Sequence, residues 1–209
     1  MSAVIIIFPP LAGGNHLKNI VSLMFCRKLD QDILALYENS SPFAHDILTT
    51  NFGRNQIQNA IANQNTQHVL QSHFGVFAGY DTELTQIIDK KFIILSATTV
   101  DDWELISNRG KSAGIKIYGD DHFKEFIRNE VGVLYQSSTV QRYFQTCSDN
   151  ILNIAISELF KSNIDPLLKK LADFLGVKNF KKEHVNNIHT NWVQANDQMI
   201  ETYLKENKL

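Results

Sequence analysis

The sequence predicts an α/β domain in which helices cover a mostly parallel sheet. Short apolar runs rich in β-branched residues alternate along the chain with segments whose apolar residues recur at helical spacing, which is typical of that class. The first run, residues 3–8, is apolar at every position, as expected of a strand buried on both faces. A chain of 209 residues suits one domain with embellishments, so we expect a single domain over residues 1–209.

The predicted elements follow in chain order. The strand over 3–8 ends at a double proline, and a glycine turn then leads into a helix over about 16–28, with Asn15 as its expected N-cap. Further strands are predicted over 67–73, 91–96 and 150–156. Further helices are predicted over 31–37, 54–64, 81–89, 100–108, 121–129, 138–146 and 165–175, and a long C-terminal helix over 182–206. Thr99 or Asp101 is expected near the start of the 100–108 helix, and a glycine directly follows the 165–175 segment, where left-handed residues often end helices.

Composition excludes several classes of protein. The chain has 20 Lys and Arg against 22 Asp and Glu, and this balance argues against a general nucleic-acid binder. Cys26 and Cys147 are too few for a disulfide scaffold or a four-cysteine zinc site. His184 and His189 lie five residues apart, which is the wrong spacing for a helical metal pair, so no metal is expected. The run over 3–8 is too short for a membrane helix and lacks the features of a secretory signal. We therefore expect a cytoplasmic protein without membrane or nucleic-acid partners.

The turn over residues 9–15 carries the clearest chemical signal. A buried strand followed by glycines and a helix suits an anion, because the first N–H groups of a helix lack partners and glycines let an oxyanion approach the backbone. The turn contains neither the G-x-x-x-x-G-K-[ST] nor the G-x-G-x-x-G pattern. From local chemistry, anion binding and a purely structural turn are both open.

Four segments together resemble the sulfotransferase family. Pro10-Leu11-Ala12-Gly13-Gly14-Asn15-His16-Leu17 resembles its 5′-phosphosulfate loop, Pro-Lys-Ser-Gly-Thr-Thr-Trp-Leu, which also follows the first strand. Residues 69–74 resemble the second strand of the family, which ends in a Thr-His or Ser-His pair. Residues 91–109 resemble the third strand and the helix that binds the 3′-phosphate, and 150–177 resemble a later strand, turn and helix. These segments cover less than half of the chain, and their order and spacing are more specific than any one motif.

The resemblance implies a P-loop-like three-layer fold with a helical C-terminus that binds 3′-phosphoadenosine 5′-phosphosulfate as the sulfuryl donor. It implies that the chain transfers the sulfuryl group to a hydroxyl of a small-molecule or glycan acceptor, with His73 as the catalytic base. The donor-binding positions that it implies are Leu11, Ala12, Gly13, Gly14, Asn15, His16, Ser107 and Arg109.

Some positions differ from the family pattern. Leu11 stands where the family has a lysine, Gly14 and Asn15 stand where it has hydroxyl residues, and Thr99 stands where it has an arginine if Ser107 is aligned with the family serine. These differences leave a second function open: a catalytically impaired member that binds a nucleotide or phosphate, or that uses its C-terminal helix to dock a partner. A P-loop kinase is disfavoured because the loop offers no lysine and no Ser or Thr for Mg²⁺. Homo-oligomerisation is also left open.

Overall fold

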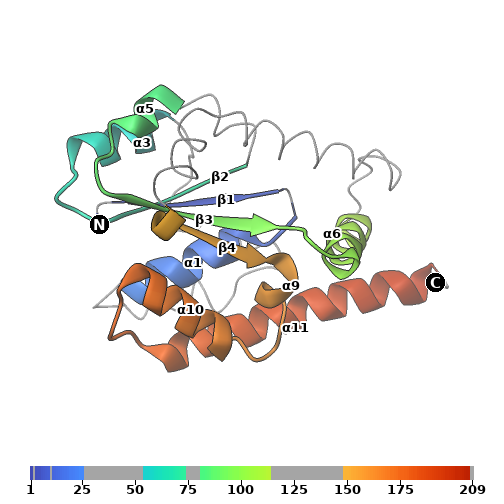
Figure 1. Ribbon diagram of the computed structural model, residues 1–209. Helices are drawn as coiled ribbons and strands as arrows, with labels where there is room; N and C mark the ends of the chain where they lie inside the picture. Colours follow the sequence, from blue (N-terminus) through green and yellow to red (C-terminus); the bar gives the residue numbers. More distant parts are fainter. Residues whose placement is uncertain (2, 10, 26–53, 74–80, 114–147, 208–209) are drawn as a thin grey trace.

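The computed structural model of the chain describes residues 1, 3–9, 11–25, 54–73, 81–113 and 148–207 (Figure 1). The predicted helices over 31–37, 121–129 and 138–146 lie outside these residues, as do both cysteines.

A four-stranded parallel sheet forms the centre of the fold. Its strands are β1 (Ala3–Phe8), β2 (His68–His73), β3 (Lys90–Ser96) and β4 (Ile151–Ala155), and they lie in the order β2-β1-β3-β4. All three pairings are parallel. The α/β class and the four predicted strands are therefore confirmed, with ends that differ by one residue at most.

Helices cover both faces of this sheet, which gives three layers (Figure 1). One face carries α1 (Gly14–Phe25), α9 (Ile156–Leu159), α10 (Asp165–Leu175) and α11 (Lys182–Glu206). The other face carries α3 (Arg54–Ala62) and α5 (Asp81–Thr85). The helix α6 (Val100–Ser112) follows β3 and packs against α11, beyond the carboxyl ends of the strands.

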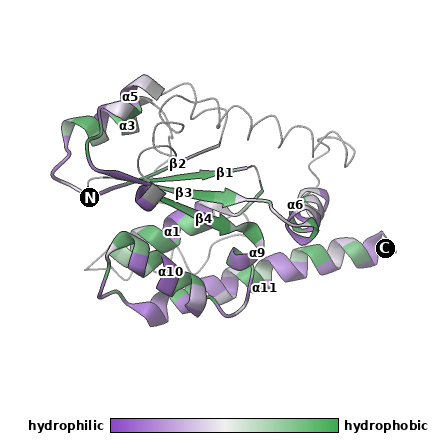
Figure 2. Ribbon diagram, in the orientation of Figure 1, coloured by the Kyte–Doolittle hydropathy of each residue, from purple (hydrophilic) through white to green (hydrophobic). Residues whose placement is uncertain are grey.

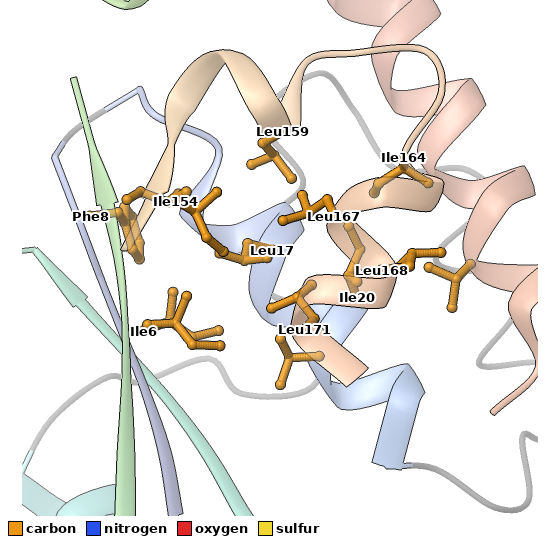
Figure 3. Close-up of a cluster of buried hydrophobic side chains, with 14 of the residues drawn as sticks. Ile6, Phe8, Leu17, Ile20, Ile154, Leu159, Ile164, Leu167, Leu168 and Leu171 are labelled. Carbon is orange, nitrogen blue, oxygen red and sulfur yellow. The ribbon is translucent and has the colours of Figure 1, made fainter. Parts of the chain in front are cut away.

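The alternating side chains of β1 explain why this strand is apolar throughout. Val4, Ile6 and Phe8 belong to the core on the α1 side, whereas Ile5 and Ile7 belong to the core on the α3 side. Figure 2 shows the resulting hydrophobic colour along β1 and β3. Figure 3 shows the larger core, in which side chains of the sheet meet those of α1 and α10; those labelled include Ile6, Phe8, Leu17, Ile20, Leu167, Leu168 and Leu171.

The helix ends follow the sequence closely in the C-terminal part. α10 and α11 have the predicted bounds, and Gly176 ends α10 with a φ of 71°. At the first helix the expected N-cap is wrong: α1 begins at Gly14, so Asn15 lies inside its first turn. The reason is that the Gly13 carbonyl already accepts the Leu17 N–H at 3.0 Å, with Gly13 in the left-handed region. Within the residues described above, no helix is long and apolar enough to cross a membrane.

Three further helices differ in length from their predictions. α3 ends at Ala62 rather than at residue 64. α5 ends at Thr85 rather than at residue 89, because a turn buries Ile87 in the core before β3 begins. α6 continues past residue 108 to Ser112, through a glycine that the sequence pattern did not favour within a helix. Its start is as predicted: Thr99 is the N-cap, and a reciprocal capping box joins it to Asp102.

Candidate functional site

The carboxyl edge of the sheet, next to the end of β1, is the candidate site. From β1 the chain moves to β2 on one side, and it then crosses to β3 on the other side. Ligands of open parallel sheets bind where the strand order reverses in this way, beyond the carboxyl ends of the strands. The glycine loop, of which the structure describes residues 9 and 11–13, leaves β1 at this point, and residues 97–99 leave β3 at the same edge.

The backbone of His73 lies directly beside the start of the glycine loop. His73 is the last residue of β2, and its register partner is Phe8, the last residue of β1. Two segments that are more than sixty residues apart in the sequence are thus brought together by strand pairing alone. The structure therefore places the proposed base and the proposed anion loop at one edge of the sheet.

Gly13 at the end of the loop and Gly14 at the start of α1 are both required by their surroundings. A Cβ on Gly13 would lie 3.0 Å from the side chains of Leu159 and Trp192, and its φ of 81° is left-handed. A Cβ on Gly14 would lie 2.0 Å from the ring of Phe8. The loop therefore packs tightly against β1 on one side and against α9 and α11 on the other.

The first turn of α1 supplies the backbone donors of the candidate site. It begins at Gly14 and continues through Asn15 and His16. The first N–H groups of a helix have no carbonyl partner within the helix, and the helix dipole gives this end a partial positive charge. The turn carries no acidic side chain, so this positive end is not neutralised from within the helix.

Arg109, on α6, holds the backbone of the glycine loop through a hydrogen bond. Its side chain is only 2% exposed, and its Nη1 donates a hydrogen bond to the carbonyl of Leu11. Its Nε donates to Oδ1 of Asn196 at 2.7 Å. The guanidinium carbon lies 5.0 Å from the ring centre of Phe160 and 5.5 Å from that of Trp192. Burial lowers the pKa of Arg109 to about 10, which leaves it protonated at neutral pH.

His16 packs against α11. It is fully buried and stacks on Trp192, with 4.0 Å between ring centres and 8° between ring planes. Its Nε2 is 3.1 Å from Nδ1 of His189, whose own Nε2 is 2.7 Å from the carbonyl of Lys161. Because that carbonyl only accepts, His189 carries its proton on Nε2 and accepts on Nδ1, and His16 therefore donates from Nε2. Burial lowers the pKa of His16, and His189 and Arg109 lower it further; burial also lowers the pKa of His189.

Asp102 joins the segment that follows β3 to the start of α9, which follows β4. It is fully buried, and its two oxygens accept the backbone N–H groups of Thr98, Thr99 and Ser157 at 2.7 to 2.9 Å. Burial alone would raise its pKa, but these hydrogen bonds outweigh it and lower the pKa to about 2. The carboxylate therefore has a structural role: it joins the chain after β3 to the chain after β4, at the edge where the candidate site lies.

The structure brings most of the sequence-predicted donor residues together. Residues 11–16 form the loop and the first turn of α1, and Arg109 reaches the loop from α6. Ser107 is half-buried on α6, two positions before Arg109, so the two side chains leave that helix in different directions. Sequence reasoning did not assign Asn196 or the tie made by Asp102. The pattern Thr99-x-x-Asp102 is a capping-box signal that could have found the second of these.

No group of acidic, histidine or cysteine side chains suited to a metal ion occurs in the part of the chain that the structure describes. No protein-family model and no curated protein matches the chain. Among solved structures, it is similar to retinol dehydratase in complex with androsterone and the inactive cofactor PAP, with a TM-score of 0.45, 11% identity, and coverage of 91% of this chain and 64% of that one. A second retinol dehydratase structure, in a complex with retinol and PAP, gives a TM-score of 0.43, 12% identity, and coverage of 88% and 62%. The chain thus spans less than two thirds of the length of either.

Proposed function

We propose that the chain transfers a sulfuryl group from 3′-phosphoadenosine 5′-phosphosulfate to an acceptor hydroxyl. The observation that supports this most directly is the pairing of Phe8 with His73, because it brings the predicted base to the strand end from which the glycine loop departs. The acceptor class, a small molecule or a glycan, comes from the sequence resemblance alone.

In this proposal the donor is held mainly by the backbone. The N–H groups at the start of α1, from Gly14 onward, face the negative phosphosulfate, and the helix dipole adds a favourable field. Gly13 and Gly14 let the backbone of this donor-binding segment pack against Leu159, Trp192 and Phe8, where a Cβ would not fit. The resemblance assigns Ser107 and Arg109 to the 3′-phosphate. The guanidinium of Arg109 is turned toward Leu11 and Asn196, which supports a role exerted through the loop.

The proposed chemical step is a single displacement at sulfur. The imidazole of His73 takes the proton of the acceptor hydroxyl while the acceptor oxygen bonds to sulfur. The bond between sulfur and its bridging oxygen breaks, and adenosine 3′,5′-bisphosphate leaves with that oxygen and its electron pair. A base of this kind contributes about 10²–10⁴-fold to a rate, and fixing the two reactants in one orientation contributes further.

A second candidate is binding of the nucleotide without transfer. Leu11 offers no cation to the bridging oxygen of the donor, and the guanidinium of Arg109 is bonded to protein oxygens. Both observations favour a chain that retains the fold and the anion loop but lacks part of the catalytic charge.

Calorimetric titration with adenosine 3′,5′-bisphosphate tests the binding site. We expect micromolar affinity, and we expect Asn15→Asp to weaken it at least tenfold, because a carboxylate in the first turn repels the anion while remaining favourable for the helix itself. Gln86→Glu makes the same charge change at the opposite edge of the sheet and is expected to bind like the unaltered chain. Absence of binding at millimolar nucleotide would contradict the proposed function.

Transfer of labelled sulfate from the donor to a panel of hydroxyl acceptors separates the two candidates. His73→Gln is expected to lower the transfer rate by about 10²–10⁴-fold with little change in nucleotide affinity. His68→Gln alters a histidine at the other end of β2 and serves as the control. Nucleotide binding without transfer to any acceptor class would favour the second candidate.

A further inference from the structure

Leu11 holds a backbone conformation that its side chain disfavours. Its φ is 67°, and within the described ranges it is the one non-glycine residue with a positive φ. A residue with a Cβ disfavours this conformation, because its Cβ comes too close to the following carbonyl oxygen. Strain of this kind persists only where the surroundings hold it in place.

Two consecutive residues of α6 hold Leu11. Arg109 donates a hydrogen bond from Nη1 to the Leu11 carbonyl. The Leu11 side chain lies against the next residue, since its Cδ1 is 3.0 Å from the position that a Cβ on Gly110 would take. The backbone and the side chain of Leu11 are thus both attached to one turn of α6.

The guanidinium is itself held in a fixed direction by α11. Asn196 accepts from Nε of Arg109 through Oδ1, and its Nδ2 donates to the Trp192 carbonyl at 2.7 Å, which fixes the orientation of the amide. The rings of Phe160 and Trp192 lie on the planar head of Arg109. Three segments that are distant in sequence therefore determine where this cation lies.

The charge of Arg109 acts close to the loop and is poorly screened. The side chain is almost entirely buried, and buried charges are screened by salt much less than exposed ones. The guanidinium is hydrogen-bonded directly to the backbone carbonyl of Leu11. Leu11 occupies the position at which the sequence resemblance implies a lysine.

We infer that Arg109 is a positioning residue of the proposed donor site. It holds Leu11, and with it the glycine loop, in the left-handed conformation. From α6 it also supplies the positive charge that the Leu11 side chain does not provide. The inference rests on the proposed function for the identity of the anion, 3′-phosphoadenosine 5′-phosphosulfate or its product bisphosphate. It assigns Arg109 an action through the loop rather than a contact with the nucleotide.

Charge substitution at position 109 tests the inference. Arg109→Gln is expected to lower the affinity for adenosine 3′,5′-bisphosphate about tenfold, and Arg109→Lys, which keeps the charge, is expected to lower it less. Adding Leu11→Lys to Arg109→Gln is expected to restore part of the lost affinity, because the cation then lies in the loop itself. Lys111→Gln makes the same charge change two residues further along α6, where the side chain is exposed, and is the matched control.

Amide hydrogen exchange gives a readout that does not require a ligand. Exchange at Ala12, Gly13 and Gly14 is expected to rise in Arg109→Gln and to stay unchanged in Lys111→Gln. If Arg109→Gln does not fold, Asn196→Ala removes the acceptor that orients the guanidinium and is expected to increase exchange at the same amides.

The outcomes separate the two proposals. Lack of nucleotide binding by the unaltered chain contradicts the proposed function, while faster loop exchange in Arg109→Gln still supports the positioning role. Nucleotide affinity and loop exchange that are both unchanged in Arg109→Gln, or equally changed in Lys111→Gln, would overturn the inference.

Discussion

The imidazole rings of His16 and His189 form a buried hydrogen bond of 3.1 Å that joins the first turn of α1 to α11. The helix that begins the candidate site is thereby attached to the C-terminal helix through two neutral rings. His16 also stacks on Trp192, so the attachment includes the same ring that lies against Gly13.

This pair predicts that the protein loses stability as the pH falls below about 6.5. Burial is the first cause that lowers the pKa of each ring, so the folded state binds fewer protons than the unfolded state. The contribution is fully present above the unfolded pKa and is lost as the pH falls through the lower folded values. The loss approaches about 1.4 kcal/mol per pH unit for each proton taken up on unfolding.

Urea unfolding at pH values between 7.5 and 5 measures this dependence. His16→Phe keeps a ring against Trp192 but cannot be protonated, so we expect a shallower slope in this variant. His68→Gln removes a histidine at the other edge of the sheet, outside this pair, and is the control variant. Equal slopes for the unaltered chain and His16→Phe would contradict the assignment.

The tie made by Asp102 predicts a second stability effect. Its pKa is lowered from 3.8 to about 2, which corresponds to about 2 kcal/mol of stability that is present above pH 4 and is lost as the pH falls toward 2. Asp102→Asn is therefore expected to lower the free energy of unfolding by about 2 kcal/mol at pH 7, because an amide nitrogen cannot accept from backbone N–H groups.

Asp101→Asn is the matched control for this experiment, since Asp101 is the exposed neighbour in the same first turn of α6. It is expected to change the unfolding free energy by less than about 0.5 kcal/mol. If both variants lose the same amount, the loss comes from the helix dipole and not from the hydrogen bonds that join residues 98–99 to the start of α9.

The sequence predicted the elements of this fold better than the contacts of the site. The strand β1 could be predicted because it is apolar at every position, as expected of a strand that is buried on both faces. The end of α10 could be predicted because Gly176 is a glycine, which readily adopts the left-handed conformation found there. The pairing that places His73 beside Phe8 depends on strand order, which local periodicity does not contain.

The environment of Arg109 shows what local sequence could not predict. Its partners are Leu11, 98 residues earlier, and Asn196, 87 residues later. No spacing rule connects three such positions, and a single asparagine on a long helix gives no signal of its own. The predicted Asn15 cap was wrong because the Gly13 carbonyl already accepts the Leu17 N–H, so the helix begins one residue earlier than the general preference for Asn at N-caps indicates.

The close approach of Gly14 to Phe8 predicts a strong packing penalty. Gly14→Ala places a methyl group 2.0 Å from ring atoms of Phe8, with no left-handed strain because the residue is helical. Overpacking of this kind costs about 1–3 kcal/mol, which thermal or urea unfolding measures.

A double-variant cycle shows whether the ring causes this penalty. Phe8→Ala removes Cγ, Cδ1 and Cδ2, the ring atoms that the methyl group would meet. Gly14→Ala is therefore expected to cost less in that background, with a coupling of about 0.5–3 kcal/mol. Additive losses in the double variant would show that Phe8 is not the obstacle.

Gly13 and Gly176 together separate backbone strain from packing. Both are left-handed, with φ values of 81° and 71°. A Cβ on Gly176 would meet nothing within 4 Å, whereas one on Gly13 would meet Leu159 and Trp192 at 3.0 Å. Gly176→Ala should therefore report strain alone, about 1 kcal/mol, and Gly13→Ala should add about 1–3 kcal/mol from crowding.

The same two variants also show whether an effect on nucleotide affinity is specific to the glycine loop. Gly176 follows α10 at the opposite edge of the sheet from the glycine loop, so Gly176→Ala is expected to leave affinity for adenosine 3′,5′-bisphosphate unchanged. Gly13→Ala is expected to weaken that affinity, since the methyl group pushes the loop away from Trp192. Equal unfolding losses in the two variants would show that Trp192 yields to the added methyl, and the tight fit of the loop against α11 would then be disproved.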